Sequence, residues 1–193
     1  MSKRVRPFQR AAAVRVQPSD IPVATIRPAA PADLPAIGRL GALLVRMHHD
    51  FDPQRFIAAT PQTEKAYGAF LGTQLGERNV VILAAERDGV VIGYTYAGVE
   101  GRDYMALRGP AGALYDLVVD PAHRERGVGR MLLDATLEAL RARGAPRVVL
   151  STAERNESAR RLFARAGFRQ TMIEMTRELA GDAAVRAPGG APA

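Results

Sequence analysis

The residues whose types and spacing point most directly to chemistry lie between positions 117 and 130, LVVDPAHRERGVGR. Gly127 and Gly129 stand where an apolar helical pattern begins, and three arginines surround them: Arg124, Arg126 and Arg130. The start of a helix offers unpaired backbone N–H groups and the positive end of the helix dipole, which together suit a phosphate. Glycine lets a ligand approach the backbone closely, and arginine adds charge. The segment predicts a phosphate-binding turn.

The order of features around the two glycines makes this prediction specific, because Gly-x-Gly alone is common by chance. An apolar strand ends at Val119, Asp120-Pro121 turns the chain, and an amphipathic helix follows. Its apolar residues are spaced i, i+3, i+4, i+7 and i+11: Val128, Met131, Leu132, Ala135 and Ala139. The segment has neither the Gly-Lys-Ser/Thr of a Walker A loop nor the third glycine of a dinucleotide fingerprint. The alternative is a helix that merely begins after a glycine turn.

Metal and thiol chemistry are not expected. The chain has no cysteine, which excludes disulfides, zinc–thiolate sites and thiol nucleophiles. His48 and His49 are adjacent on a helical segment, so their side chains point in different directions and cannot easily share a metal. His123 lies in the loop before the glycines, where it contacts solvent or phosphate.

The length and charge indicate one domain with two tails. Of 193 residues with a formal net charge of +7, the first 20 hold five basic residues and one acid, so about +4 lies there. We expect a disordered basic tail over 1–22, a domain over 23–179 and a disordered, Pro/Gly-rich tail over 180–193. With no secretory signal or transmembrane-length segment, we expect a cytoplasmic protein. The Ala/Arg/Gly/Pro bias is typical of a bacterial one.

Residue periodicity predicts an α/β fold. Strands are expected over 23–27, 80–86, 90–99, 113–119, 148–152 and 171–176, with a two-residue hairpin at Asp88-Gly89. Helices are expected from Pro31 to about Met47 and over 62–75, 127–143 and 157–166. Only a mixed sheet flanked by helices accommodates this order easily.

The glycine turn and a second segment resemble the GNAT superfamily of N-acetyltransferases. Arg124-x-x-Gly127-x-Gly129 is similar to that family's pyrophosphate motif. The second segment, Asn156-x-x-Ala-x-x-Leu-Phe163 followed by Ala-Gly-Phe168, is similar to its second cofactor segment. The resemblance covers about residues 26–179. It implies a central mixed, mostly antiparallel sheet flanked by about four helices, and acetyl-CoA as cosubstrate.

The resemblance also implies roles for individual residues. Leu117, Val118 and Val119 would present strand backbone to the pantetheine arm and the acetyl carbonyl, and an amide of Val118 or Val119 would polarise the thioester. Asn156 would bond the pantetheine, and Phe163 would lie near the sulfur. The strands holding Val118 and Val148 would splay apart, with a β-bulge at 117–119. The pyrophosphate would be wrapped by backbone amides of Glu125, Arg126, Gly127, Val128, Gly129 and Arg130, beside Arg124.

The chain departs from the family at both proton-transfer positions. Many members have a tyrosine at the position of Phe163, where it protonates the departing thiolate. The ribosomal-protein N-terminal acetyltransferases have a glutamate base where this chain has Ser151. A base here would come from Asp116, Glu100, Glu154 or Glu174. Asp116 is preferred because it lies in the strand that leads to the acetyl site, on the face of Val118.

The expected activity is acetyl transfer to a primary amine of a small molecule or peptide, with Asp116 and Val119 as catalytic candidates. The alternatives are a non-catalytic acyl-CoA-binding sensor or interaction module and, ranked lower, nucleic-acid binding through the basic arm. The resemblance suggests a homodimer. Acceptor specificity is expected in two segments, 47–56 and 100–112.

Overall fold

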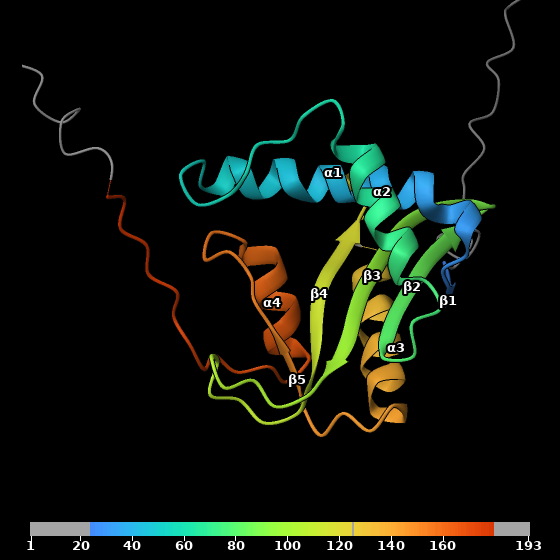
Figure 1. The fold of residues 1–193 in the computed structure, drawn as a ribbon. Coiled ribbons are helices and arrows are strands. Elements are labelled where there is room, and N and C mark those ends of the chain that lie inside the picture. Colours follow the sequence, from blue (N-terminus) through green and yellow to red (C-terminus); the bar gives the residue numbers. More distant parts are fainter. Residues whose placement is uncertain (1–23, 125, 180–193) are drawn as a thin grey trace, which may run out of the picture.

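A computed structural model describes residues 24–124 and 126–179 of the chain. The two predicted tails, 1–22 and 180–193, lie outside the described residues. The elements follow the predicted order. They are β1 (Thr25–Pro28), the 3₁₀ turn η2 (Pro31–Asp33), α1 (Leu34–Phe51), α2 (Thr63–Gln74), β2 (Val80–Arg87), β3 (Val90–Glu100), β4 (Ala111–Val119), the 3₁₀ turn η3 (Pro121–His123), α3 (Val128–Ala142), β5 (Val148–Leu150) and α4 (Glu157–Arg165) (Figure 1).

The sheet is mixed and mostly antiparallel, as predicted. Its strand order is β1-β2-β3-β4-β5; the first three pairings are antiparallel and the last is parallel. The β2–β3 turn is formed by Asp88 (φ 52°) and Gly89 (φ 74°). Two consecutive positive φ values characterise the type I′ turn, whose twist matches that of a hairpin. The predicted fold class is confirmed.

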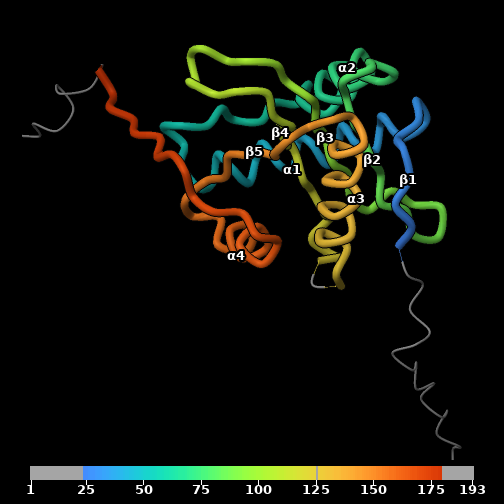
Figure 2. Tube along the Cα trace, turned by 90° about the horizontal axis from the view of Figure 1, so that it is seen from below, coloured from blue at the N-terminus to red at the C-terminus, as the bar shows by residue number. Residues whose placement is uncertain are grey.

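Helices pack against both faces of the sheet. On one face, α1 and α2 bury a cluster with the strand residues Ile82, Ala84, Tyr94 and Val118. On the other, α3 and α4 bury Leu133, Leu140 and Phe163 against Val81, Ala97 and Leu114. Figure 2, seen from below, shows α2 and α3 on opposite sides of the strands. Alternate residues of β4 therefore face different helix layers.

The predicted last strand, 171–176, does not form. The segment has no regular secondary structure and pairs with no strand of the described chain. Its apolar side chains are exposed: Met172 by 78%, Ile173 by 85% and Met175 by 89%. Apolar and β-branched residues favour a strand, but a strand also needs a partner edge, which sequence periodicity cannot supply. β4 also begins two residues earlier than predicted, and β5 ends two residues earlier.

Within residues 24–124 and 126–179, no helix combines the length and apolarity required to cross a membrane. The expected cytoplasmic location stays a prediction.

Candidate functional site

The central feature of the site is a gap between β4 and β5. The two strands pair only at Gly112–Val148, Ala113–Val149 and Leu114–Leu150. β4 continues to Val119 with β3 as its partner, and from Tyr115 onward no other strand of the described residues pairs with its second edge. Figure 1 shows β4 running upward while the chain after β5 turns into α4. The pairing thus ends early, as the predicted splay of these strands requires.

A β-bulge lies at Tyr115, and the prediction of a bulge at 117–119 is wrong. Tyr96 pairs with Asp116, and Ala97 pairs with Leu114, so Tyr115 is the extra residue. From Leu117 to Val119 the pairing with β3 is regular. Gly93 lets β3 and β4 approach closely here, because a Cβ on Gly93 would lie 2.7 Å from the carbonyl oxygen of Val118. The bulge leaves Tyr115 partly exposed and turns Asp116 inward.

The backbone of Val119 faces the gap. The Asp120 N–H donates to the Ile92 carbonyl on β3 at 2.8 Å, so by two-residue alternation the N–H of Val118 also points toward β3. The N–H and C=O groups of Leu117 and Val119 then point the other way. Arg124 Nε donates to the Val119 carbonyl oxygen at 3.0 Å from that side. Of the two amides considered from the sequence, the geometry favours that of Val119.

The glycine turn lies at the start of α3. Gly127 caps the helix with φ 78°, and a Cβ built on it would have no neighbour within 4 Å. Val128 is buried and anchors the first turn in the core, so it can meet a ligand only through its backbone. Gly129 follows in the first turn of the helix. The turn is open and lies at the start of a helix, the kind of position that suits a phosphate.

The three arginines predicted to surround this turn differ in their contacts. Arg130 is paired with Asp134 at 2.7 Å and also donates to the Arg165 carbonyl oxygen. Arg126 is exposed. Arg124 is held by its bond to Val119 described above, and Glu125 lies outside the described residues. Arg124 is therefore the arginine that the structure fixes between the strand end and the turn.

Asn156 and Phe163 have structural roles within α4. The Asn156 side-chain oxygen caps the helix by accepting from the Ala159 N–H at 3.2 Å, which leaves its amide donors out of the cap. Phe163 is only 9% exposed and packs edge-on against Phe168, with ring centroids 5.8 Å apart. Both residues lie on the helix that follows β5. Their predicted ligand contacts stay predictions.

Truncation of Phe163 is expected to cost much stability. Replacing a buried phenylalanine by alanine removes apolar area and leaves a cavity, typically about 3–5 kcal/mol in a well-packed core. Phe163→Leu keeps most of the volume and should cost less. Urea unfolding of the two variants checks this order, and equal midpoints would show that the ring adds nothing to the packing.

Asp116 sits in a buried network on the α1/α2 face. It is 7% exposed, and its Oδ2 accepts from Tyr67 Oη at 2.6 Å and from Tyr94 Oη at 3.0 Å. Burial raises the pKa of Asp116, and the two phenol hydrogen bonds and the charge of His48 oppose that rise. A buried carboxylate with a raised pKa beside a gap is typical of functional sites.

The other candidate carboxylates lie outside this network. Glu100 accepts from Tyr115 and Arg108, and these bonds lower its pKa. Glu174 pairs with Arg55, which lowers its pKa as well. Glu154 is exposed. Of the four acids proposed from the sequence, only Asp116 is buried next to the gap.

The structure separates the two segments predicted to set specificity. Segment 47–56 lies on the Asp116 side, where Arg155 donates to the Phe51 carbonyl oxygen at 2.7 Å and Arg55 pairs with Glu174. Segment 100–112 is at the opposite end of the sheet in Figure 1. Of the two, only segment 47–56 lies on the side of Asp116, and its role in specificity stays a prediction.

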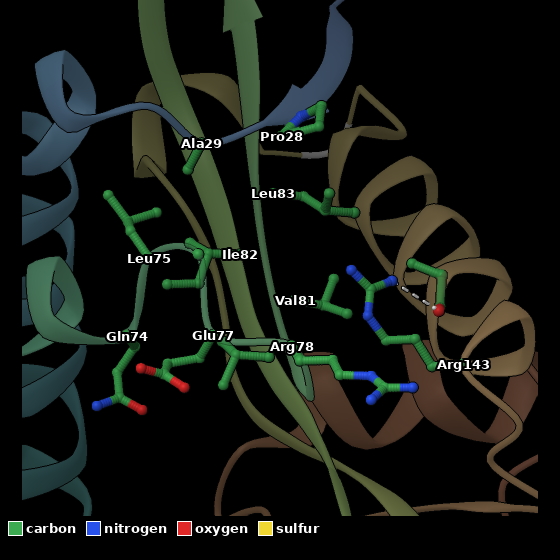
Figure 3. Close-up of a pocket in the computed structure, with 13 residues that line it drawn as sticks. Pro28, Ala29, Gln74, Leu75, Glu77, Arg78, Val81, Ile82, Leu83 and Arg143 are labelled. Atoms are coloured by element: carbon green, nitrogen blue, oxygen red, sulfur yellow. Dashed lines mark hydrogen bonds between the residues drawn. The ribbon is translucent and has the colours of Figure 1, made fainter.

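A cavity of about 370 Å³ lies away from this gap, at the edge of β2 between α2 and α3. Figure 3 shows Val81, Ile82 and Leu83 along it, with Arg78 and Arg143 at its rim. None of the residues predicted to bind a cofactor lines it.

Comparisons with known proteins agree with the geometry. The model of the acetyltransferase (GNAT) family matches residues 44–168. Mycothiol acetyltransferase of Thermobispora bispora is 38% identical over 95 residues, 47% of this chain and 30% of that protein. The same enzyme of Thermomonospora curvata is 35% identical over 94 residues, 49% and 29%. This chain thus spans less than a third of these relatives.

Solved structures share the fold. An aminoglycoside N-acetyltransferase in complex with CoA aligns with a TM-score of 0.63 and 20% identity, over 88% of this chain and all of that one. A GCN5-related N-acetyltransferase from Ralstonia eutropha aligns with a TM-score of 0.62 and 24% identity, over 82% and 99%. Since the family model covers most of the chain and includes the β4–β5 gap and the glycine turn, this protein belongs to the GNAT acetyltransferase family.

Proposed function

We propose that this protein is an N-acetyltransferase that transfers the acetyl group of acetyl-CoA to a primary amine of a small molecule or peptide. The observation that carries the proposal is a pair of backbone features close in the chain. They are the edge of β4 at Leu117–Val119, which no other described strand covers, and the open glycine turn at Gly127. Strand amides for an extended amide-containing arm and helix amides for a pyrophosphate are the groups that CoA needs.

Each of these two features has a proposed task. The amides of residues 126–130 hold the pyrophosphate, and the Leu117–Val119 edge pairs with the pantetheine. The Val119 N–H stabilises the negative charge that develops on the thioester oxygen. Asp116 lies on the opposite face of β4 from the side chains of Leu117 and Val119, so it supplies the anionic group on the side where the ammonium approaches.

The reaction is a direct attack without a covalent enzyme intermediate. The amine lone pair forms a bond to the thioester carbon, and the C–S bond breaks with its electron pair leaving on sulfur. Phe163 has no proton to give, so the thiolate leaves unassisted by that residue or takes a proton from water. A thiolate is a tolerable leaving group, which makes a phenylalanine at this position compatible with turnover.

Several observations support a small-molecule acceptor. The relatives are named for mycothiol and one fold neighbour for aminoglycosides. The side of the sheet on which the amine is proposed to approach, however, carries Arg55 and Arg155 as well as Asp116. A strongly cationic acceptor prefers an acidic surface, so we infer an acceptor with one amine and few further positive charges.

The competing function is a non-catalytic acyl-CoA sensor, which the absence of a tyrosine at 163 and of a carboxylate at 151 favours. Product formation separates the two. Purified protein is incubated with acetyl-CoA and a panel containing an aminosugar, a polyamine, an amino acid and a short peptide, and products are detected by mass spectrometry. An acetylated amine establishes the enzyme. Acetyl-CoA binding without any product from a broad amine panel supports the sensor, and no binding contradicts both.

A further inference from the structure

One histidine occupies the sheet-facing side of α1. Ile37, Leu40 and Leu44 follow the i, i+3, i+7 spacing of a buried stripe, and all three pack in the cluster against the sheet. His48 is the next position of that stripe, one turn after Leu44. Figure 1 shows this end of α1 extending past β4 toward the side where α4 lies. Met47 beside His48 contacts Arg124, which bonds the Val119 carbonyl oxygen, and Phe51 bonds Arg155 just before α4. The segment that holds this polar ring therefore lies between the end of β4 and the start of α4.

A backbone hydrogen bond fixes the tautomer of this ring. His48 Nδ1 lies 2.9 Å from the Leu44 carbonyl oxygen. A carbonyl oxygen can only accept, so Nδ1 carries the proton, and in the neutral ring Nε2 holds the free lone pair. Phe51 and Phe56 pack edge-on against the ring with centroids 5.9 and 5.0 Å away. The ring is therefore held with one nitrogen ready to accept a proton.

The charged groups around His48 suit that role. The charge of His48 opposes the rise that burial causes in the pKa of Asp116, and Tyr67 of α2 donates to the same carboxylate. On other elements, Arg55 pairs with Glu174, Arg155 bonds the Phe51 carbonyl oxygen, and Arg124 contacts Met47. Asp116 Oδ2 already accepts from two phenols, which makes that oxygen a poor base. Its negative charge instead stabilises a protonated imidazole.

We propose that Nε2 of His48 accepts the proton that the acceptor amine must lose, with Asp116 stabilising the resulting imidazolium. The inference rests on the proposed function. One proton moves from the R–NH₃⁺ group to Nε2, and the freed lone pair attacks the thioester carbon. The C–S bond then breaks, and its electron pair stays on sulfur. The nitrogen loses its second proton, the thiolate takes up one proton, and His48 returns its own proton to solvent.

The tautomer can be tested without any substrate. The sequence contains three histidines, His48, His49 and His123, so single glutamine variants assign their ring resonances. Long-range ¹H–¹⁵N spectra distinguish a protonated from an unprotonated ring nitrogen. We expect Nδ1 of neutral His48 to be protonated and Nε2 unprotonated. The reverse tautomer would overturn the proposal.

The kinetic test compares His48→Gln with the matched variant His49→Gln. His49 Nδ1 bonds a carbonyl oxygen in the same way, that of Phe56 at 2.9 Å, but it lies about 100° around the helix. His48→Gln should lower kcat/KM about 100-fold or more, the usual contribution of a general base, and keep the acetyl-CoA thermal shift. His49→Gln should act on KM at most.

Chemical rescue completes the test. Added imidazole should restore part of the activity of His48→Ala and none in His49→Ala, because only the first has lost a proton acceptor. An active wild type whose His48 and His49 variants behave alike overturns the inference and leaves the proposed function standing. A wild type that acetylates no amine overturns the proposed function, and this inference with it.

Discussion

Glutamate at position 127 is expected to abolish acetyl-CoA binding in a protein that still folds. The Gly127 turn is open, so a Cβ there meets no atom of the described residues within 4 Å, and the glutamate would place a carboxylate at the proposed pyrophosphate site. Repulsion between the two anions and the added bulk remove the favourable interaction. The positive φ of 78° also costs any residue other than glycine roughly 1–2 kcal/mol.

Gly144 provides the matched control for this strain. It has φ 83°, a Cβ on it also meets no atom within 4 Å, and it follows the opposite end of α3. Gly127→Glu and Gly144→Glu should therefore lose similar stability without ligand. At about a hundred times the Kd, acetyl-CoA should add roughly 2.7 kcal/mol to wild type and to Gly144→Glu, and nothing to Gly127→Glu. Equal thermal shifts in both variants would show that the turn does not hold the pyrophosphate.

Replacement of Asp116 by asparagine is expected to lower activity and raise stability at the same time. Burial raises the pKa of Asp116 above its unfolded value, so this group stabilises the fold at acid pH and loses that contribution as pH rises through the folded pKa. At pH 8 the ionised carboxylate is therefore a cost. Asparagine carries no charge, and its oxygen can accept both phenol hydrogen bonds. Without the anion beside His48, kcat/KM should fall about 100-fold.

Glu100→Gln is the control with the opposite sign. Tyr115 and Arg108 lower the pKa of Glu100, so its ionised form stabilises the fold above the ordinary pKa of a glutamate and loses this as pH falls. Urea unfolding at pH 8 should show Asp116→Asn more stable and Glu100→Gln less stable than wild type, with activity lost only in the first. A less stable Asp116→Asn would mean that the carboxylate is structural.

Local signals predicted most of the fold. The Asp88-Gly89 turn fixed the hairpin, and the apolar spacing of α1 and α3 set the helices that cover the sheet. The prediction of a strand at 171–176 was wrong because a strand needs a partner edge, and the availability of that edge depends on the tertiary structure. The bulge was misplaced by two residues because its position is set by the register of β4 against β3, which no pattern within β4 records.

The sequence predicted those parts of the candidate site that lie within one segment, but not the contacts between separate helices and strands. The glycine turn and Asp116 are visible in the sequence because strand alternation and the helix start place them. His48 was considered there as a metal ligand and as part of segment 47–56, not as a base. Its bond to Leu44 is suggested by the i, i+4 spacing, but its relation to Asp116 depends on the path of α1 across the sheet.

The short contact between β4 and β5 has a consequence for the motions of the protein. Three residue pairs join β5 to the rest of the sheet, so the unit of β5 and α4 should open locally at a lower free energy than β2 and β3. In hydrogen exchange, the amide of Val119 should exchange quickly in the free protein, since no strand covers it. A ligand lying in the gap acts as a temporary neighbouring strand, and it should slow exchange at Val119 and throughout α4 together.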